Sequence, residues 1–280
     1  MTYNELYQQI IKKHSFLCVG LDSDSELIPE HLKSSKNPIF EFNKAIIDAT
    51  ASYTVAYKPN TAFYEAEGIH GWEQLEMTIR YIRGIYPDIM VIVDAKRGDI
   101  GNTAKQYARA FFEKMNCDAV TVSPYMGRDS IEPFLEYEGK WSIVLALTSN
   151  ESAADFETNI IVNENDESKM ETQLYKNVIR KTMTWGSKEN TMFVVGATRP
   201  ESLKEIREIC PDHFLLVPGV GKQGGSVDEV AKYGLNSNCG LLINSSRGII
   251  FADRTHRFAQ AAEKEARNLA LKMELLLKNI

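Results

Sequence analysis

The 280-residue chain is 44% hydrophobic and 25% charged, proportions typical of a soluble globular protein long enough for one large α/β domain. Its net charge of −6 excludes the basic footprint of a broad nucleic-acid binder, although a local cleft can still attract an anionic small molecule. The first 15 residues are polar and of mixed charge, unlike a signal peptide, and no apolar run approaches the ~18 residues of a membrane span.

The cysteines are scattered along the chain without a close pair, which indicates neither a disulfide framework nor a zinc site. They are Cys18, Cys117, Cys210 and Cys239. We therefore expect a protein of the reducing cytoplasm that has no contact with membranes.

Eight apolar runs with the composition of buried strands recur along the chain. They are residues 16–21, 54–57, 89–93, 119–122, 142–147, 192–195, 214–217 and 241–243. Segments with helical spacing alternate with these runs, most clearly the apolar stripe within residues 104–115. This alternation predicts a (β/α)₈ barrel that forms a single domain over residues 1–280, because the rival doubly wound sheet seldom reaches eight evenly spaced units.

Three segments stand outside the repeat. Residues 1–13 predict a short extra helix that covers the closed end of the barrel, and residues 253–277 predict a terminal helix. Residues 148–169 are acidic, polar and too long for an ordinary connection between a strand and a helix. This stretch is either a solvated excursion or a mobile flap over the catalytic face.

Charged residues stand where the first three strands are expected to end. Asp22 follows the first run, Lys58 the second, and Asp94 and Lys96 the third, with Asp99 on the turn beyond. Alternation along a strand points Asp94 and Lys96 the same way, roughly 7 Å apart. Five charges of alternating sign at one barrel mouth indicate a preorganised electrostatic site, and a salt-bridge cluster that seals the barrel is the alternative.

The loops after the later strands carry polar and glycine-rich sequence. Ser123 follows the fourth run, and residues 218–225 after the seventh run contain several glycines together with Pro218 and Gln223. Arg247 follows the eighth run. Barrels commonly bind phosphate at their last two loops, where backbone N–H groups and an arginine can hold the anion.

The stretch Asp94-Ala-Lys-Arg-Gly-Asp-Ile-Gly-Asn-Thr-Ala104 resembles the catalytic signature of the orotidine 5′-phosphate decarboxylase family, in the form found in its longer bacterial branch. The resemblance covers essentially the whole barrel, through residues 18–22, 57–60, 123–125, 218–225 and 247. It implies decarboxylation of orotidine 5′-phosphate to UMP in de novo pyrimidine biosynthesis, without metal or cofactor. It also implies a homodimer with shared active sites, in which Asp99 and Thr103 reach into the partner's site.

The resemblance also implies a role for each charged residue at the mouth. Lys96 would donate the proton to C6 of the pyrimidine, and Asp94 and Asp99 would flank it and keep it charged. Lys58 would bridge these carboxylates.

The substrate-binding residues implied by the resemblance contact the ribose, the pyrimidine and the phosphate. They are Asp22, Thr103, Ser123, Pro218, Gln223 and Arg247. The chain departs from many members of the family in one place, because Ser245 and Ser246 precede Arg247 where a glycine is common.

Two other functions compete with this interpretation. Sugar-phosphate decarboxylases and synthases of the same superfamily, such as 3-keto-gulonate 6-phosphate decarboxylase, share the Asp-x-Lys-x-x-Asp spacing but use Mg²⁺ and an acidic residue after the second strand. Here that place holds Lys58, which would repel the metal. A non-catalytic barrel that merely binds a nucleotide would need the phosphate loops but not Lys96 between two acids.

Overall fold

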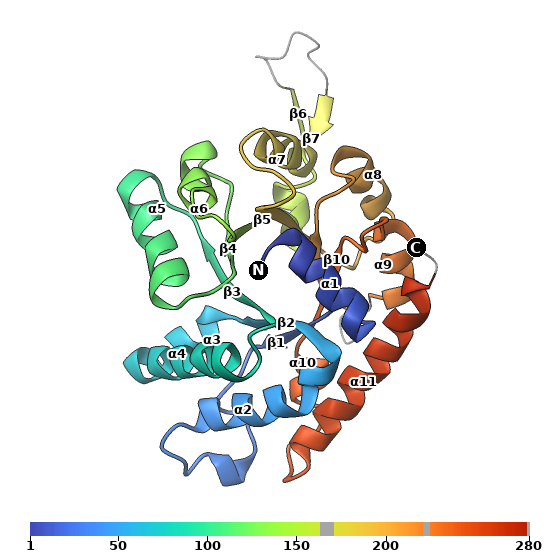
Figure 1. The fold of residues 1–280 in the computed structure, drawn as a ribbon. Coiled ribbons are helices and arrows are strands. Elements are labelled where there is room, and N and C mark those ends of the chain that lie inside the picture. The colour runs from blue at the N-terminus through green and yellow to red at the C-terminus, as the bar shows by residue number, and fades with distance from the viewer. Residues whose placement is uncertain (163–170, 221–224, 279–280) are drawn as a thin grey trace.

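Eight parallel strands close into a barrel in the computed structural model, which describes residues 1–162, 171–220 and 225–278 (Figure 1). The order around the barrel is β1-β10-β9-β8-β5-β4-β3-β2. These strands are β1 (Leu17–Leu21), β2 (Thr54–Pro59), β3 (Met90–Arg97), β4 (Ala119–Val122), β5 (Trp141–Leu147), β8 (Thr191–Val195), β9 (Leu215–Pro218) and β10 (Leu241–Ser245). The predicted (β/α)₈ barrel is thereby confirmed.

The strands coincide with the eight apolar runs because each strand is enclosed between the barrel interior and the surrounding helices. Every residue of β1, β2, β4, β8 and β10 is buried. The largest differences from the predicted ends are at β3, which continues past Val93 to Arg97, and at β2 and β10, which each continue two residues further, to Pro59 and Ser245. These extensions carry polar side chains from the barrel wall to its mouth.

Helices surround the barrel (Figure 1). They are α2 (Pro38–Thr50), α3 (Thr61–Glu65), α4 (Gly68–Ile85), α5 (Gly101–Ala108), α6 (Glu132–Leu135), α7 (Leu174–Met183), α8 (Ser202–Ile209), α9 (Val227–Gly234), α10 (Arg247–Ile250) and α11 (Phe258–Leu277). Short 3₁₀ turns are η1 (Glu30–Leu32), η2 (Ala51–Tyr53), η4 (Arg128–Ser130) and η5 (Glu151–Asp155), and α5 continues as a π-helical segment, η3 (Arg109–Lys114). Among the helices of the described residues, none combines the length and the apolar character that a bilayer-spanning segment needs.

Helix α1 (Tyr3–Lys13) lies across the end of the barrel where the strands begin (Figure 1). A capping box begins the helix, because the side chains of Thr2 and Glu5 each accept the other's backbone N–H. The Tyr3 ring packs on Phe214, just before β9, with ring centroids 5.0 Å apart. The functional site must therefore open at the other end of the barrel.

The long connection after β5 forms a two-stranded antiparallel hairpin, β6 (Ile160–Val162) and β7 (Glu171–Gln173). Figure 1 shows this hairpin beyond α7, displaced outward from the barrel axis. Near its base, Glu157 Oε2 accepts the N–H of Thr148 at 2.6 Å. The predicted flap also includes residues 163–169, which lie outside the described residues.

Candidate active site

A cavity of about 200 Å³ opens at the carboxyl ends of the strands. Its lining consists of Asp22, Lys58, Asn60, Asp94, Ser149, Pro218, Gly219, Val220, Asn244, Ser245, Ser246, Arg247 and Gly248. Catalytic sites of (β/α)₈ barrels lie at this end, because the connections that follow the strands converge there.

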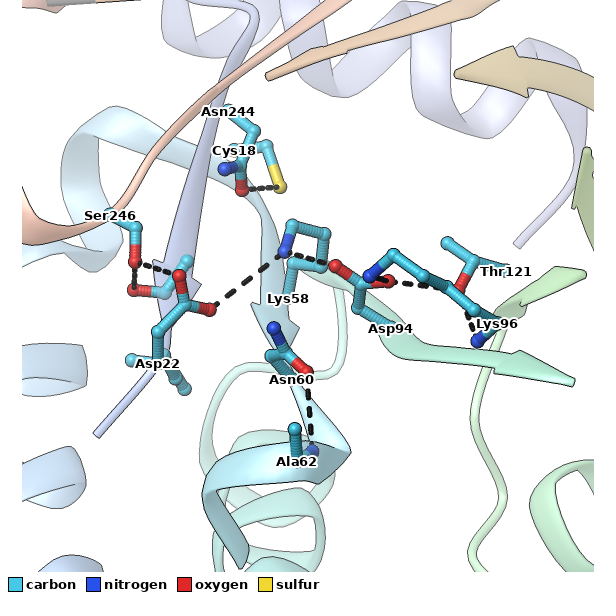
Figure 2. Close-up of polar contacts among 12 residues, drawn as sticks. Cys18, Asp22, Lys58, Asn60, Ala62, Asp94, Lys96, Thr121, Asn244 and Ser246 are labelled. Atoms are coloured by element: carbon cyan, nitrogen blue, oxygen red, sulfur yellow. Dashed lines mark hydrogen bonds and ion pairs between the residues drawn. The ribbon is translucent and has the colours of Figure 1, made fainter. Parts of the chain in front are cut away.

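Lys58 is the charged centre of the cavity (Figure 2). It lies near the end of β2, and only 4% of its surface is exposed. Its Nζ donates to Asp94 Oδ2 at 2.9 Å and lies 3.9 Å from Asp22 Oδ1. Burial alone would lower the pKa of Lys58, but the two carboxylates outweigh it and raise the pKa above that of an ordinary lysine. Lys58 therefore stays an ammonium ion throughout the neutral range.

Asp94 is held between two lysines. Its Oδ2 accepts from Lys58, and its Oδ1 accepts from Lys96 Nζ at 2.6 Å (Figure 2). Burial would raise the pKa of this carboxyl group, but the two ammonium groups together lower it well below its usual range. Asp94 is consequently a carboxylate at neutral pH, and any negative group brought beside it is repelled.

The backbone around Lys96 is bulged. Strand β3 is paired with β4 at Val93 and again at Arg97, and the register shifts between them. Lys96 itself has φ of 46°, a left-handed conformation that residues with a Cβ rarely adopt. The side chains of Asp94 and Lys96 do meet, but through this bulge rather than through the regular alternation expected from the sequence.

Asp22 is held from the other side of the cavity. Ser246 donates its hydroxyl hydrogen to Asp22 Oδ2 at 2.6 Å, and the same hydroxyl lies 3.3 Å from the Gly20 carbonyl oxygen. Ser246 comes this close because residue 20 is a glycine, whose added Cβ would lie 2.7 Å from the Ser246 Cβ. Asp22 Oδ1 is buried and forms no hydrogen bond within the described part of the chain, so Lys58 compensates its charge from 3.9 Å.

Four of the predicted residues are not among the side chains that line this cavity. One is Lys96, which is joined to it through its ion pair with Asp94, and the others are Asp99, Thr103 and Ser123. Asp99 is half-buried on the turn after β3, where its Oδ1 accepts the N–H of Ile100 at 2.8 Å. Thr103 is exposed on the first turn of α5. Ser123 lines a separate, largely apolar cavity of about 630 Å³ beside α7. A single chain thus does not bring Asp99, Thr103 and Ser123 to Lys58, whereas Lys96 reaches the same carboxylate, Asp94.

The predicted phosphate residues are placed in part. Pro218 ends β9 and Arg247 begins α10, and both line the cavity. The Arg247 side chain is exposed and forms no ion pair with the described residues, so its donors are available to an anion. Gln223 lies within residues 221–224, which are outside the described residues.

Polar residues that the sequence interpretation did not select complete the site. Thr121 donates to Asp94 Oδ1 at 2.9 Å, and Asn60 lines the cavity while its Oδ1 accepts the N–H of Ala62 at 3.2 Å. Asn244 Oδ1 accepts the Cys18 thiol hydrogen at 3.6 Å (Figure 2). The signal for Thr121 and Asn244 was present, because each is a polar residue within or directly after an apolar run.

Comparison with known proteins gives consistent matches over nearly the whole chain. The model of a family described as "Orotidine 5'-phosphate decarboxylase / HUMPS family" matches residues 15–262. A Phocaeicola vulgatus protein named orotidine 5′-phosphate decarboxylase is 55% identical over 277 residues, 99% of each chain. A Flavobacterium johnsoniae protein of the same name is 58% identical over 266 residues, 95% of this chain and 94% of that one. The solved structure of Leishmania donovani OMP decarboxylase superposes with a TM-score of 0.80 at 33% identity, covering 99% of both chains.

Proposed function

The chain belongs to the orotidine 5′-phosphate decarboxylase / HUMPS family, and from this premise we infer that it decarboxylates orotidine 5′-phosphate to UMP in pyrimidine biosynthesis. It is accordingly a carboxy-lyase. The observation that carries this inference is the chain of charges from Asp22 through Lys58 and Asp94 to Lys96. Alternating fixed charges of this kind match a reaction that replaces a carboxylate by a carbanion and then by a proton.

Lys96 is the proposed proton donor. When the bond from C6 to the carboxylate breaks, CO₂ leaves and the electron pair remains on C6 in an orbital that the ring delocalises poorly. An ammonium group beside C6 stabilises this charge as it develops and then supplies the proton. The neutral amine left on Lys96 regains its proton from solvent, which completes the cycle without metal or cofactor.

Asp94 acts in two ways in this proposal. It keeps Lys96 in place, and it repels the substrate carboxylate before that group is lost. A like-charge contact at ~4 Å corresponds to about 4 kcal/mol at an effective dielectric of 20, whereas enzymes lower barriers by about 8–23 kcal/mol. Stabilisation of the carbanion by Lys96 must therefore supply the larger share.

The remaining predicted residues bind substrate in this scheme. Asp22 and Lys58 reach the ribose hydroxyls. Ser123 is assigned to the pyrimidine edge, although in this structure its side chain lines the separate cavity beside α7. Gln223 and Arg247 hold the phosphate dianion at the last two loops, and Pro218, which lines the cavity at the end of β9, contacts the substrate. The position of Arg247 at the cavity, with its side chain exposed, supports this assignment.

We further propose a homodimer in which Asp99 and Thr103 complete the active site of the partner subunit. Their placement supports the proposal, because both lie toward the surface and outside the cavity of their own chain. Mixing inactive Lys96→Ala with inactive Asp99→Ala should restore activity, since half of the random dimers regain one intact site, or about one quarter of the wild-type sites. Lys96→Ala mixed with the double variant Lys96→Ala/Asp99→Ala is the matched control, because no intact site can form. No recovery despite subunit exchange would place Asp99 in its own chain's site.

The function is tested with orotidine 5′-phosphate carrying ¹⁴C in its carboxylate. Wild-type protein should release labelled CO₂ and an equal amount of UMP, and Lys96→Ala should lower turnover by about 10³-fold or more. Lys12→Ala on α1, at the opposite end of the barrel, is the control and should leave turnover unchanged. Undiminished turnover by Lys96→Ala would remove its assigned role, and tight UMP binding without turnover by the wild type would favour a non-catalytic nucleotide-binding barrel.

A Mg²⁺-dependent sugar-phosphate enzyme is the second candidate. The ammonium group of Lys58, 2.9 Å from Asp94, opposes it, because a cation already occupies the position where this carboxylate would bind metal. Turnover should therefore survive EDTA. Activity that EDTA abolishes and Mg²⁺ restores would favour the sugar-phosphate enzyme.

The proposed compartment is the reducing cytoplasm. All four cysteines are free and buried, which fits a protein that does not depend on disulfide bonds.

A further inference from the structure

The hydroxyl group of Thr121 lies between two atoms of the segment that carries Asp94 and Lys96. Thr121 is on β4, and only 1% of its surface is exposed. Its Oγ1 accepts the backbone N–H of Lys96 at 2.9 Å and donates to Asp94 Oδ1 at 2.9 Å (Figure 2). A hydroxyl group has a single proton, and here the carboxylate can only accept it. The direction of both hydrogen bonds is therefore determined.

These bonds close a ring around Lys96. Asp94 Oδ1, which accepts from Thr121, also accepts from Lys96 Nζ at 2.6 Å. The backbone nitrogen of Lys96 is thus joined to this oxygen through Thr121, and the side-chain nitrogen is joined to it directly. The two ends of the lysine are fixed relative to one carboxylate oxygen.

This ring of hydrogen bonds lies at a position where the backbone conformation is strained. Lys96 has φ of 46°, which is costly for a residue with a Cβ and persists only where surrounding contacts impose it. The register of β3 against β4 also shifts between Val93 and Arg97. At Lys96, the side chain of Thr121 supplies the acceptor for the backbone N–H.

We propose that Thr121 is a positioning residue of the decarboxylation, whose hydroxyl group holds the left-handed backbone of Lys96 and thereby aims its ammonium group at C6. Thr121 itself does not touch the reacting atoms. The proposal rests on the proposed function for its kinetic consequence, but its structural content is independent of the substrate.

The variant Thr121→Val removes the hydroxyl group and keeps the branched shape of the side chain. Losing a hydrogen bond to a charged group is expected to change a rate constant by about 10- to 100-fold. We therefore expect a kcat about 10- to 100-fold below that of wild type, with KM changed by less than about threefold. Thr121→Ser retains the hydroxyl group and should recover most of the lost kcat. A merely structural role predicts lower stability without this division between kcat and KM.

The matched control is Thr54→Val. Thr54 is a buried threonine at the start of β2, far from the mouth, and its hydroxyl donates to the Thr50 carbonyl at 2.9 Å. This variant should lose similar thermal stability and keep wild-type kcat. If Thr121→Val does not fold, Thr121→Ala removes the same hydroxyl group without adding a methyl group against Asp94.

Residue-resolved amide hydrogen exchange by NMR provides a second measurement, made without substrate. The Lys96 amide should exchange slowly in wild type and in Thr121→Ser, and much faster in Thr121→Val, while the amides of β1 are unchanged. Equal protection of the Lys96 amide in all three proteins would overturn the proposal, as would wild-type kcat in Thr121→Val. A wild-type chain that makes no UMP would instead refute the proposed function, and amide exchange would still decide whether Thr121 holds Lys96.

Discussion

Replacing Lys58 with methionine should destabilise the fold strongly, because it removes the cation that Asp94 and Asp22 share. At an effective dielectric of 20, the 2.9 Å contact with Asp94 corresponds to about 6 kcal/mol, and the 3.9 Å contact with Asp22 to about 4 kcal/mol. The substitution also removes the desolvation penalty of the lysine itself, several kcal/mol, so the net loss is smaller than the sum. We expect the free energy of unfolding at pH 7 to fall by about 3–5 kcal/mol.

Urea denaturation of wild type and Lys58→Met, with m-values compared to confirm that both unfold in the same manner, measures this loss. Lys12→Met is the control, since Lys12 pairs with Asp88 at 3.5 Å with both side chains more than half exposed, and such pairs contribute no more than about 1 kcal/mol. Adding Asp94→Asn should cost less in the Lys58→Met background than in wild type, because Asp94 has then already lost one partner. Equal losses from Lys58→Met and Lys12→Met would refute the electrostatic reasoning.

Three further predictions concern acid stability, the end of β3 and the phosphate site. Burial opposes the charge on Asp94, but its two lysine partners lower the pKa of this carboxyl group below its usual value. The resulting stabilisation is present above about pH 4 and is lost as the pH falls toward the lowered pKa of Asp94. Thermal melts should show this loss in wild type but not in Asp94→Asn. Arg97→Met should lower the melting temperature more than Glu65→Gln does. The Arg97 guanidinium pairs with Glu65 at 2.5 Å and also lies over the Tyr107 ring, 5.3 Å from its centroid, so only Arg97→Met removes both contacts. Equal changes in melting temperature would exclude a contribution from the contact with Tyr107. Arg247→Met should raise KM for orotidine 5′-phosphate by about tenfold or more without changing the melting temperature, and an unchanged KM would exclude Arg247 as a phosphate ligand.

The barrel could be predicted because its signal is local. A strand covered on both faces must be apolar throughout, so each strand can be recognised from its own sequence, without information about the strands that pair with it. The run at residues 119–122 coincides with β4 residue for residue. Only the ends were misjudged, as at β3, where charged side chains at the mouth continue the strand to Arg97. Hydrophobicity cannot mark an end that is set by backbone pairing.

The meeting of the charged residues at the ends of β2 and β3 could be predicted in the same way, because strand ends converge in any barrel, whereas the position of Asp99 could not. Lys58 and Asp94 lie where that rule puts them. The hydrogen bond from Ser246 to Asp22 joins residues 224 positions apart, and it depends on the missing side chain of Gly20. The left-handed backbone of Lys96 lies within the register shift between β3 and β4. These features arise where two strands meet, so they cannot be predicted from the sequence of either strand alone.

Burial separates the two lysines by what each can do. The Lys58 side chain is 5% exposed and is paired with two carboxylates, so it is poorly placed to exchange protons with solvent. The Lys96 side chain is 49% exposed although it contacts the same Asp94. A proton donor must be recharged from water in every cycle, which favours Lys96 for that role and leaves Lys58 to fix the charges around it. Lys96→Ala should therefore abolish turnover but lower the free energy of unfolding by no more than about 1 kcal/mol, because solvent screens its ion pair. Lys58→Met should lose both turnover and stability. A Lys96→Ala variant as unstable as Lys58→Met would show that Lys96 is held as rigidly as its buried neighbour.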